Sequence, residues 1–346
     1  MTRNDRIYYA CQAVVIVPTG GDPSAGGTSI VRGLQSIGMN SNFTLEQVFE
    51  IGQLEIYENI EDVADIEVTL EKVIDGDKLI YNLATDGACK TDLAAAAKAR
   101  SDVYLAIFPD DQSNATGVPL NVCWNSGMYV SSVSYNYSVD GNATESVTLV
   151  GNDRFWNDQV SLDGATTANS KFADDTTDGE FAGSEAPNSG VVRRRNVNVA
   201  GSSLPVLVES QVGDGSGAAN DQGGAFHVQS IAVSADFGQE NINELGRYGP
   251  YAKYATFPIE VTSEFEVIAT SGDLKSVSGV DINLTEGSGT GEEIKIKDDA
   301  GTILDLGTKN KLSSVSYSGG DTGGGNATVS YSYSNFNSLL VDDSSA

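Results

Sequence analysis

Histidine, cysteine and basic residues are scarce in this chain of 346 residues, and each shortage excludes a class of function. His227 is the sole histidine, so a Ser-His-Asp or Cys-His site would depend on that one residue, and a multi-histidine metal site is excluded. No nucleophile pattern adjoins His227, and we expect it at the start of a strand. The motifs GxxxxGK[ST], HExxH and GxSxG are absent. We therefore predict no enzyme activity, no catalytic residue, no cofactor and no metal site.

The cysteines and the apolar runs are equally uninformative about chemistry. Cys11, Cys89 and Cys123 are odd in number and show no CxxC spacing, so we interpret them as buried or free thiols. No run of about 18 apolar residues occurs, so no transmembrane helix and no membrane partner are expected. The first 21 residues mix charges with Tyr, Cys and Gln, which favours a strand over a signal peptide.

The charge balance is strongly acidic. Lys and Arg number 20 against 48 Asp and Glu, which gives a net charge of −28. Such a chain is not expected to bind nucleic acid tightly, because affinity for nucleic acid depends on basic side chains that neutralise phosphates. Two interpretations stay open: a protein that lies near DNA without adhering to it, or an acidic surface for solubility, including life in high salt.

The residues that are abundant favour strands and turns. The chain has 38 Gly and 14 Tyr, with heavy use of Ser, Thr and Asn and only 20 % charged residues. This composition predicts a mainly all-β fold of many short strands. The length suffices for two domains of about 100–200 residues each.

Two segments of the chain repeat each other. The run "QSIGMNSNFTLEQVFEIG" from Gln35 lies over "QSIAVSADFGQENINELG" from Gln229, with seven identities in one register. After one residue is lost, "IEVTLE" (66–71) falls on "IEVTSE" (259–264). A second block begins with SSVSY at Ser131 and again at Ser313, and each copy continues to GNAT and an alternating strand. Repeats in the same order predict a tandem duplication of one β unit.

The duplication sets the expected domains. Copy one spans 1–156, an Asp/Gly/Thr-rich linker or excursion spans 157–190, and copy two spans 191–346. Copy one has an Ala-rich run (91–103) that predicts a short helix, with Thr91 as its N-cap. Copy two has a hairpin with an Asp-Ala-Gly turn in 292–307, and its first strand is expected at 191–199.

The repeated strands alternate strictly in polarity. In "IEVTSEFEV" (259–267) the apolar side chains point to one face, and Glu and Thr point to the other. The runs 66–71 and 131–139 behave in the same way. Antiparallel sheets with one packed and one wetted face show this pattern. The wetted face has almost no Lys or Arg, which fits either a solvated sandwich face or the wall of an aqueous channel for something anionic.

The same residues carry a resemblance to a known family. The runs "GLQSIGMNSNFTLEQVFEIGQLEIYENIEDVADIEVTLEKVIDG" and "SVSYNYSVDGNATESVTLVGND" resemble the major tail (tail tube) proteins of tailed viruses of bacteria and archaea. The run "VSADFGQENINELGRYGPYAKYATFPIEVTSEFEVIATSGD" resembles the duplicated half of some members. The resemblance implies two tandem β-barrel or sandwich domains, one short flanking helix, and long loops at 52–65 and 246–258. It assigns the inner wall to eight strands: 34–43, 66–74, 131–139, 145–150, 228–237, 259–268, 313–317 and 328–334.

The resemblance also implies a structural function. Six units would close a ring, so three chains would suffice, with six chains as the alternative, and rings would stack into a tube. Double-stranded DNA would pass through without specific binding, in a virion tail made in the host cytoplasm. Other tail proteins would be partners: terminator, baseplate or tip, tape measure or sheath. The implied lumen-lining residues are Glu67, Thr69, Glu71, Ser132, Ser134, Glu260, Thr262, Glu264 and Glu266.

Aromatic and charged residues of the loops are the expected contacts between rings or subunits. They are Tyr57, Glu58, Glu61, Arg193, Arg194, Arg195, Arg247, Tyr248, Tyr251, Lys253 and Tyr254. Two rival functions remain: another virion or surface-layer β-sandwich, such as a decoration protein, and a carbohydrate-binding or glycosidase β-sandwich. The second is disfavoured because carboxylates lie on regular strand faces and tryptophan is limited to Trp124 and Trp156.

Overall fold

The computed structural model describes nine stretches of the chain: residues 6–20, 30–85, 93–108, 121–158, 190–198, 204–205, 227–269, 292–320 and 325–343. Strands dominate them. Among the described residues, no helix is long and apolar enough to cross a membrane.

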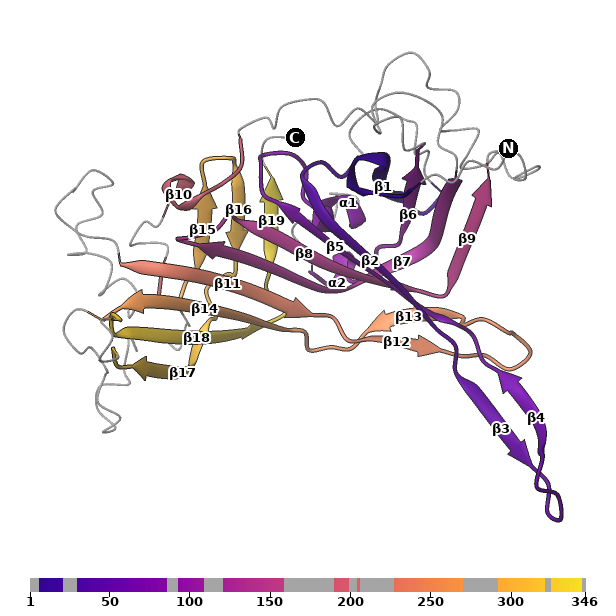
Figure 1. Ribbon diagram of the computed structural model, residues 1–346. Helices are drawn as coiled ribbons and strands as arrows, with labels where there is room; N and C mark the ends of the chain where they lie inside the picture. Colours follow the sequence, from indigo (N-terminus) through magenta and orange to yellow (C-terminus); the bar gives the residue numbers. More distant parts are fainter. Residues whose placement is uncertain are drawn as a thin grey trace.

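Eight strands form one continuous antiparallel sheet that crosses the whole molecule (Figure 1). In spatial order they are β17 (Lys311–Ser318), β18 (Thr328–Phe336), β14 (Glu260–Ile268), β11 (Val228–Asp236), β7 (Asn121–Ser138), β8 (Thr144–Gly151), β5 (Asp65–Val73) and β2 (Leu34–Asn42). Each of the eight segments predicted as inner strands is a strand of this sheet, which confirms that they are strands; their place in the wall of a ring stays a prediction. No closed barrel occurs among the described residues, and the sheet is open at β2 and β17.

The prediction of two separate sandwiches or barrels is therefore wrong. The first half of the chain supplies β2, β5, β8 and β7 side by side, and the second half supplies β11, β14, β18 and β17. β7 pairs with β11 in antiparallel register over seven residue pairs. Because backbone hydrogen bonds cross this junction, the two halves share one sheet.

Two smaller sheet regions flank the main one. The first part of the long strand β7 pairs with β6 (Ser101–Ile107) and β9 (Asp153–Asp158), and β6 pairs with β1 (Gln12–Pro18). β7 then continues into the main sheet past Gly127, which has a positive φ of 62°. In the second half, a four-stranded sheet contains β10 (Val197–Asn198), β15 (Lys295–Asp298), β16 (Thr302–Asp305) and β19 (Leu340–Asp343). Its β15–β16 hairpin confirms the turn predicted in 292–307, with Gly301 at φ 97°.

Short helical elements depart from the expectations. The Ala-rich run forms only α2 (Leu93–Ala96), and β6 already begins at Ser101, within the predicted helix; Thr91 lies outside the described residues. A helix that the sequence did not predict, α1 (Ile80–Ala84), lies on the packed side of the sheet (Figure 1). A 3-10 turn, η1 (Tyr9–Cys11), precedes β1, and a second, η2 (Arg194–Asn196), replaces most of the strand expected at 191–199.

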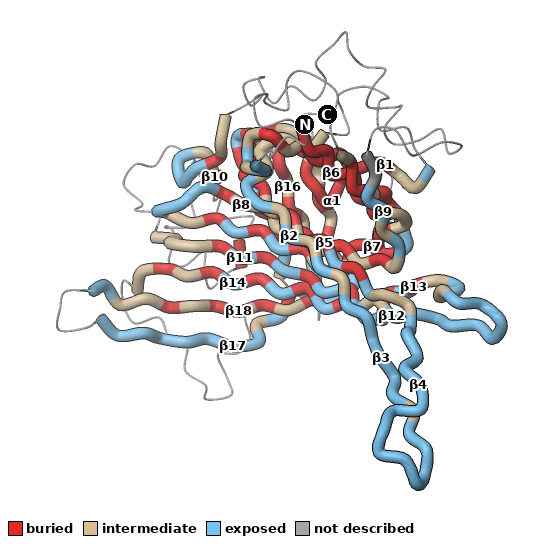
Figure 2. Tube along the Cα trace, turned by 45° about the vertical axis from the view of Figure 1, so that its right-hand side comes forward, coloured by how far each residue is buried: buried red, intermediate tan, exposed pale blue. Residues whose placement is uncertain are grey.

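One hydrophobic core spans both halves on a single side of the main sheet. The strands alternate buried and exposed residues along their length, as the banding in Figure 2 shows. Large aromatic side chains fill this core, among them Tyr135, Phe237, Phe265, Tyr331 and Tyr333. Phe265 and Tyr333 meet edge to face at 6.0 Å between ring centroids. The other side of the sheet is left to polar side chains.

The two halves repeat individual hydrogen bonds. Ser36 Oγ donates to Glu71 Oε2 at 3.3 Å, and Ser230 Oγ donates to Glu266 Oε2 at the same distance. The Ile74 amide donates to the Ala143 carbonyl at 2.9 Å, as the Ala269 amide does to Ala327. Each half also carries its strand irregularities at matching places, after Leu34 and Val228, and after Val130 and Leu312.

These recurring contacts correct the sequence alignment. The bond from Ser36 places Glu71 at the position of Glu266, whereas the sequence alignment matches Glu71 with Glu264. The second half therefore has one residue more than the first between these two strands, whereas the sequence alignment gives it one residue fewer. The shift is two residues, so it keeps every side chain on its predicted face, because strand periodicity is two.

The thiols and the histidine lie where the sequence places them. Cys11 and Cys123 are free and buried, and burial raises the pKa of Cys123 to about 11. Cys89 lies outside the described residues. His227 directly precedes β11, and its carbonyl accepts the Ile268 amide at 3.0 Å.

Candidate functional surface

The polar face is the side of the eight-stranded sheet that points away from the core. All nine residues predicted to line a lumen lie on it, on strands β5, β7 and β14. The pairings connect them across strands, because directly paired residues share a face: Thr69 lies opposite Thr148, Ser134 opposite Ser234, and Thr262 opposite Ser334. The strict alternation of the sequence thus becomes one continuous surface built from both halves.

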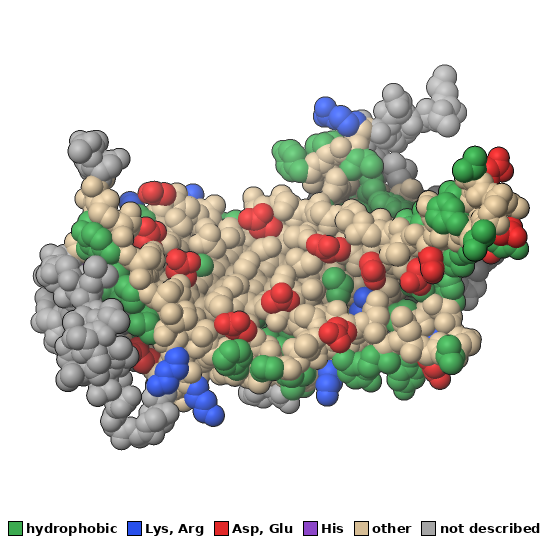
Figure 3. Space-filling view, turned by 90° about the horizontal axis from the view of Figure 1, so that it is seen from below, with side chains coloured by type: hydrophobic (Ala, Val, Ile, Leu, Met, Phe, Trp, Pro, Cys, Tyr) green, Lys and Arg blue, Asp and Glu red, His purple; other side chains and the backbone are tan. Residues whose placement is uncertain are grey.

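Carboxylates are spread over this face among uncharged polar side chains and backbone (Figure 3). Its acids on the strands include Glu67, Glu71, Glu260, Glu264 and Glu266, and also Asp236, which sequence reasoning missed. Asp236 extends the strict alternation of β11 and could have been found from it. Within the eight strands, Lys311 at the start of β17 is the sole basic residue on this face. The face therefore presents negative charge with little compensation.

The hydroxyl groups form short cross-strand contacts rather than a binding pocket. Ser234 Oγ and Thr262 Oγ1 lie 2.8 Å apart, and Thr69 Oγ1 and Thr148 Oγ1 lie 3.4 Å apart. Among the described residues, no group of three or more His, Cys, Asp or Glu could hold a metal ion. The arrangement fits a hydrated surface that repels anions, and it offers no convergent set of groups for a reaction.

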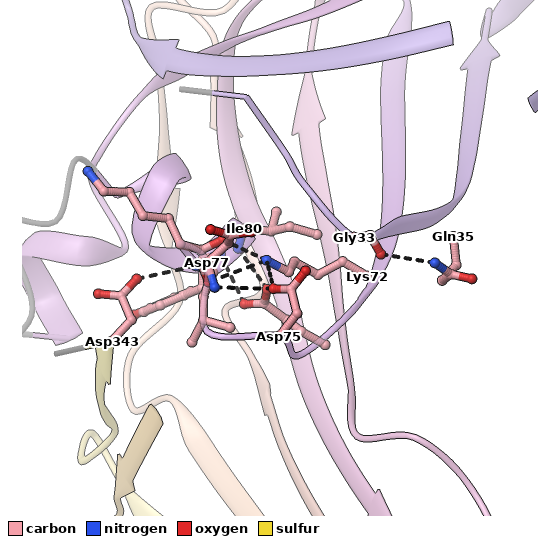
Figure 4. Close-up of polar contacts among 11 residues, drawn as sticks. Gly33, Gln35, Lys72, Asp75, Asp77, Ile80 and Asp343 are labelled. Atoms are coloured by element: carbon pink, nitrogen blue, oxygen red, sulfur yellow. Dashed lines mark hydrogen bonds and ion pairs between the residues drawn. The ribbon is translucent and has the colours of Figure 1, made fainter. Parts of the chain in front are cut away.

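A buried polar network supports the sheet from the core side (Figure 4). Glu145 on β8 is fully buried and accepts the backbone amides of Ile80 and Tyr81, at 2.7 and 3.1 Å, at the start of α1. Tyr135 donates its hydroxyl to the same carboxylate at 3.1 Å. Asp343, on the last strand, accepts the Leu79 amide at 3.2 Å. α1 thus joins both halves behind the polar face.

Lys72 belongs to this network and is also completely buried. Its ammonium forms an ion pair with Asp75 Oδ1 at 3.3 Å and donates to the Lys78 carbonyl at 2.9 Å. Burial raises the pKa of Glu145, and the charge of Lys72 opposes that rise. Removing one partner from such a buried network lowers the stability of the fold strongly, because the remaining charged group is left buried without its partner.

Glu145→Ala is expected to destabilise the fold by about 3–5 kcal/mol, because two amides and one hydroxyl lose their acceptor in the core. Glu145→Gln removes the ionisable group and also one of its two acceptor oxygens, so the pH dependence of its stability, and not the absolute value, isolates the effect of ionisation. Since burial raises the folded pKa above the ordinary 4.5, the ionisation of Glu145 costs stability progressively as pH rises from that value. Denaturation at several pH values should show wild type losing stability relative to the Gln variant as pH increases. If the difference in stability between wild type and the Gln variant stays constant as pH rises above about 4.5, the raised pKa of Glu145 is contradicted.

Within the described stretches, the two open edges of the main sheet carry little that blocks further pairing. Neither β2 (LQSIGMNSN) nor β17 (KLSSVSYS) contains proline, and Lys311 is the one charged residue in them. Natural edge strands are commonly protected by charge, proline or a covering segment. β2 is held in place by β5 and by Arg154, which donates to Ser41 Oγ at 2.6 Å and to the Asn40 carbonyl at 3.1 Å.

The loop predicted at 52–65 is a hairpin. β3 (Leu45–Phe49) and β4 (Ile56–Glu61) project far from the body, with both faces exposed (Figures 1 and 2). Tyr57, Glu58 and Glu61 lie on β4 and are exposed, and their predicted contact with a neighbouring ring stays a prediction. The apolar side chains of this hairpin, which sequence reasoning did not single out, are exposed as well: Leu45, Phe49, Ile51, Leu54, Ile56 and Ile60.

The second hairpin, β12 (Gln239–Ile242) and β13 (Ala252–Ala255), stays closer to the body (Figure 1). Gln239 anchors its base, with its side-chain amide donating to the carbonyls of Val130 and Ala97. Tyr248, Tyr251 and Tyr254 are exposed. Arg247 lies 6.0 Å from the Tyr251 ring centroid.

Lys253 is the exception among the predicted contact residues. Only 8 % of it is exposed, so the expectation of a surface cation is wrong. Burial lowers its pKa, and the charge of Asp65 opposes that effect. Arg193, Arg194 and Arg195 are exposed at η2, on the far side of the fold from the hairpins (Figure 1).

No protein-family model matches the sequence, and no curated protein does. Solved structures show distant likeness to components of injection machines and tails. The tube-terminating cap of the anti-feeding prophage aligns with a TM-score of 0.32 and 16 % identity, over 46 % of this chain and 95 % of that one. A chain of the extended sheath–tube complex of the PVC extracellular contractile injection system gives 0.32 and 12 %, over 45 % and 94 %. A chain from the tail of an empty GTA particle gives 0.28 and 12 %, over 42 % and 95 %.

Proposed function

We propose that this chain is a structural protein of a viral tail tube, in which three copies close a ring and rings stack around the path of double-stranded DNA. Each chain carries two copies of one tube unit, so the ring has pseudo-sixfold symmetry. The polar face lines the lumen, and its carboxylates keep the phosphates of the duplex at a distance. No chemical step is involved.

One observation carries this proposal: both halves of the chain place their acidic strand faces on the same side of one open sheet. A solvated sheet would also place its polar side chains on one side, but the near absence of Lys and Arg along this face in both halves favours a wall that faces an anion. The recurring hydrogen bonds, such as those to Glu71 and Glu266, support the duplication. The sequence resemblance to tail tube proteins supports the role.

Strand number supports three copies. A barrel of eight strands has its interior filled by side chains, so one chain alone cannot enclose a duplex. Three copies of eight strands make 24. With strands about 4.8 Å apart and tilted by up to about 40°, 24 strands give a backbone diameter of roughly 37–48 Å. This width leaves room for one hydrated duplex, whereas six copies would give about twice that width.

The projecting β3–β4 hairpin is the proposed contact between stacked rings. Its exposed apolar side chains and the acids of β4 can dock on an adjacent ring, where Arg247 and the tyrosines of the second hairpin offer charge and aromatic partners. Exposed apolar patches of this kind mark interaction sites in soluble proteins.

Ile51→Asp with Leu54→Asp is expected to stop stacking and to leave single rings. Both side chains are fully exposed at the hairpin tip, so folding should change by less than about 0.5 kcal/mol. Negative-stain microscopy of the variant should show rings without tubes. Ile51→Val with Leu54→Val keeps the apolar surface and should form tubes. Tubes of normal length from the Asp variant would assign stacking to another surface.

Electron microscopy of the purified protein tests the function itself. The proposal predicts hollow rings and stacked tubes, with the acidic strand face toward the channel. Monomers, flat arrays or solid particles would instead favour another virion or surface-layer protein, and the tube proposal would be withdrawn.

A further inference from the structure

The internal junction between the halves is a complete example of the contact that two chains would make. β7 and β11 pair with Ser134 opposite Ser234 on the polar face and Tyr135 opposite Val233 on the core face. The Phe237 amide donates to the Ser131 carbonyl at 2.8 Å, and the Val139 amide to Gln229 at 3.0 Å. Since antiparallel bonding alternates, the odd-numbered residues bond across this junction and Ser134–Ser234 is a non-hydrogen-bonded pair.

The open edges correspond to the two strands of this junction. The recurring bonds and irregularities equate Ser36 with Ser230, and hence β2 with β11. The pairings of Ser132 with Thr148 and of Ser314 with Ser332, each just after an irregularity, equate β17 with β7. The SSVSY repeat gives the same correspondence. The two edge strands of the sheet, β2 and β17, therefore correspond to β11 and β7, which pair with each other inside the same chain.

Apolar side chains on the edge strands are exposed, whereas their counterparts in the β7–β11 junction are buried. In the internal junction Val133 and Tyr135 are 2 % and 1 % exposed, whereas their counterparts Val315 and Tyr317 on β17 are 37 % and 49 % exposed. At the other edge, Phe43 is 66 % exposed and its counterpart Phe237 is 0 % exposed. Burying these side chains supplies a driving force for association.

We propose that β2 of one copy pairs antiparallel with β17 of the next copy in the register of β7 and β11. Asn40 then lies opposite Ser316 on the polar face, Met39 lies opposite Tyr317 on the core face, and Asn42 lies opposite Ser314. The Phe43 amide donates to the Ser313 carbonyl of the neighbouring copy. This assignment rests on the ring proposed above and adds the partner strand and the register.

Cysteine pairs on the polar face test the register under oxidised glutathione. Asn40→Cys with Ser316→Cys should cross-link neighbouring copies, because non-hydrogen-bonded pairs have Cα atoms about 4.5 Å apart, within disulfide range. Asn40→Cys with Ser314→Cys is the control shifted by two residues. Its diagonal neighbours lie roughly 7–8 Å apart, so cross-linking should fall on the order of tenfold. Ser134→Cys with Ser234→Cys should form the matching bond within one chain.

The readout is mass on non-reducing gels, with electron microscopy of the same samples. The single variants Asn40→Cys and Ser316→Cys show any contribution from native thiols. A ladder that ends at three chains supports the register and the ring together. Rings whose shifted pair cross-links better would overturn the register and leave the tube intact. If Asn40→Cys with Ser316→Cys does not fold, Asn42→Cys with Ser314→Cys makes the same test. Failure of both pairs in well-formed rings would overturn the proposal.

Discussion

Val315→Pro is expected to abolish ring assembly while leaving a folded monomer. By its correspondence with Val133, Val315 directs its amide out of the sheet toward the neighbouring copy. Proline removes that donor, leaves the facing carbonyl without a partner and places its ring in the path of the partner strand, at a cost of about 1–3 kcal/mol per junction. That cost corresponds to roughly a tenfold to hundredfold weaker association at each junction. Within its own chain an edge strand tolerates proline at such a position.

Size-exclusion chromatography and circular dichroism check this result. The variant should elute as a monomer with wild-type β signal and a melting temperature within a few degrees of wild type. Val315→Thr keeps the amide and the β-branched shape, and should assemble normally. If the proline variant still forms rings, β17 is not at the interface between copies.

Reversing three charges on the polar face, Glu67, Glu260 and Glu264 to Lys, is expected to slow genome delivery by at least about tenfold. The net charge of each chain rises by six, because each Glu→Lys change adds two. The lysines of every stacked ring can then neutralise phosphates that the wild-type wall repels. The duplex would adhere to the wall rather than slide. Delivery would be measured as the rate of DNA release from particles whose tails look normal by microscopy.

A matched control separates lumen charge from total charge. Asp140, Glu293 and Asp299 are exposed carboxylates outside the eight strands of the main sheet, and changing them to Lys alters net charge by the same amount. Their triple variant should release DNA at the wild-type rate. Normal release from the polar-face variant, in intact tails, would show that this face does not line the channel.

Strand positions and faces could be predicted from sequence because alternation of polarity is local. All eight strands of the main sheet and their shared polar face follow from that period of two. The register could not be read in the same way. The identical IEVT runs align Glu71 with Glu264, yet backbone pairing matches Glu71 with Glu266, because register depends on irregularities such as the one after Leu34.

Features that depend on tertiary contacts were also missed. Four alanines predict a longer helix than α2, but residues from Ser101 pair with β1 and β7, and strand pairing overrides the helix propensity. Lys253 looks like a surface cation in the sequence, and its burial depends on how the second hairpin meets the body. The burial of Glu145 and Lys72 behind the sheet likewise has no local signal.

Native mass measurement of a single ring tests the central claim most directly, because it counts the chains that close the sheet. Three copies of a 36.3 kDa chain predict a ring of about 109 kDa, with pseudo-sixfold symmetry in top views. Val315→Pro should give the mass of one chain. A ring of six chains, or rings that persist in the proline variant, would contradict closure by three copies through β2 and β17.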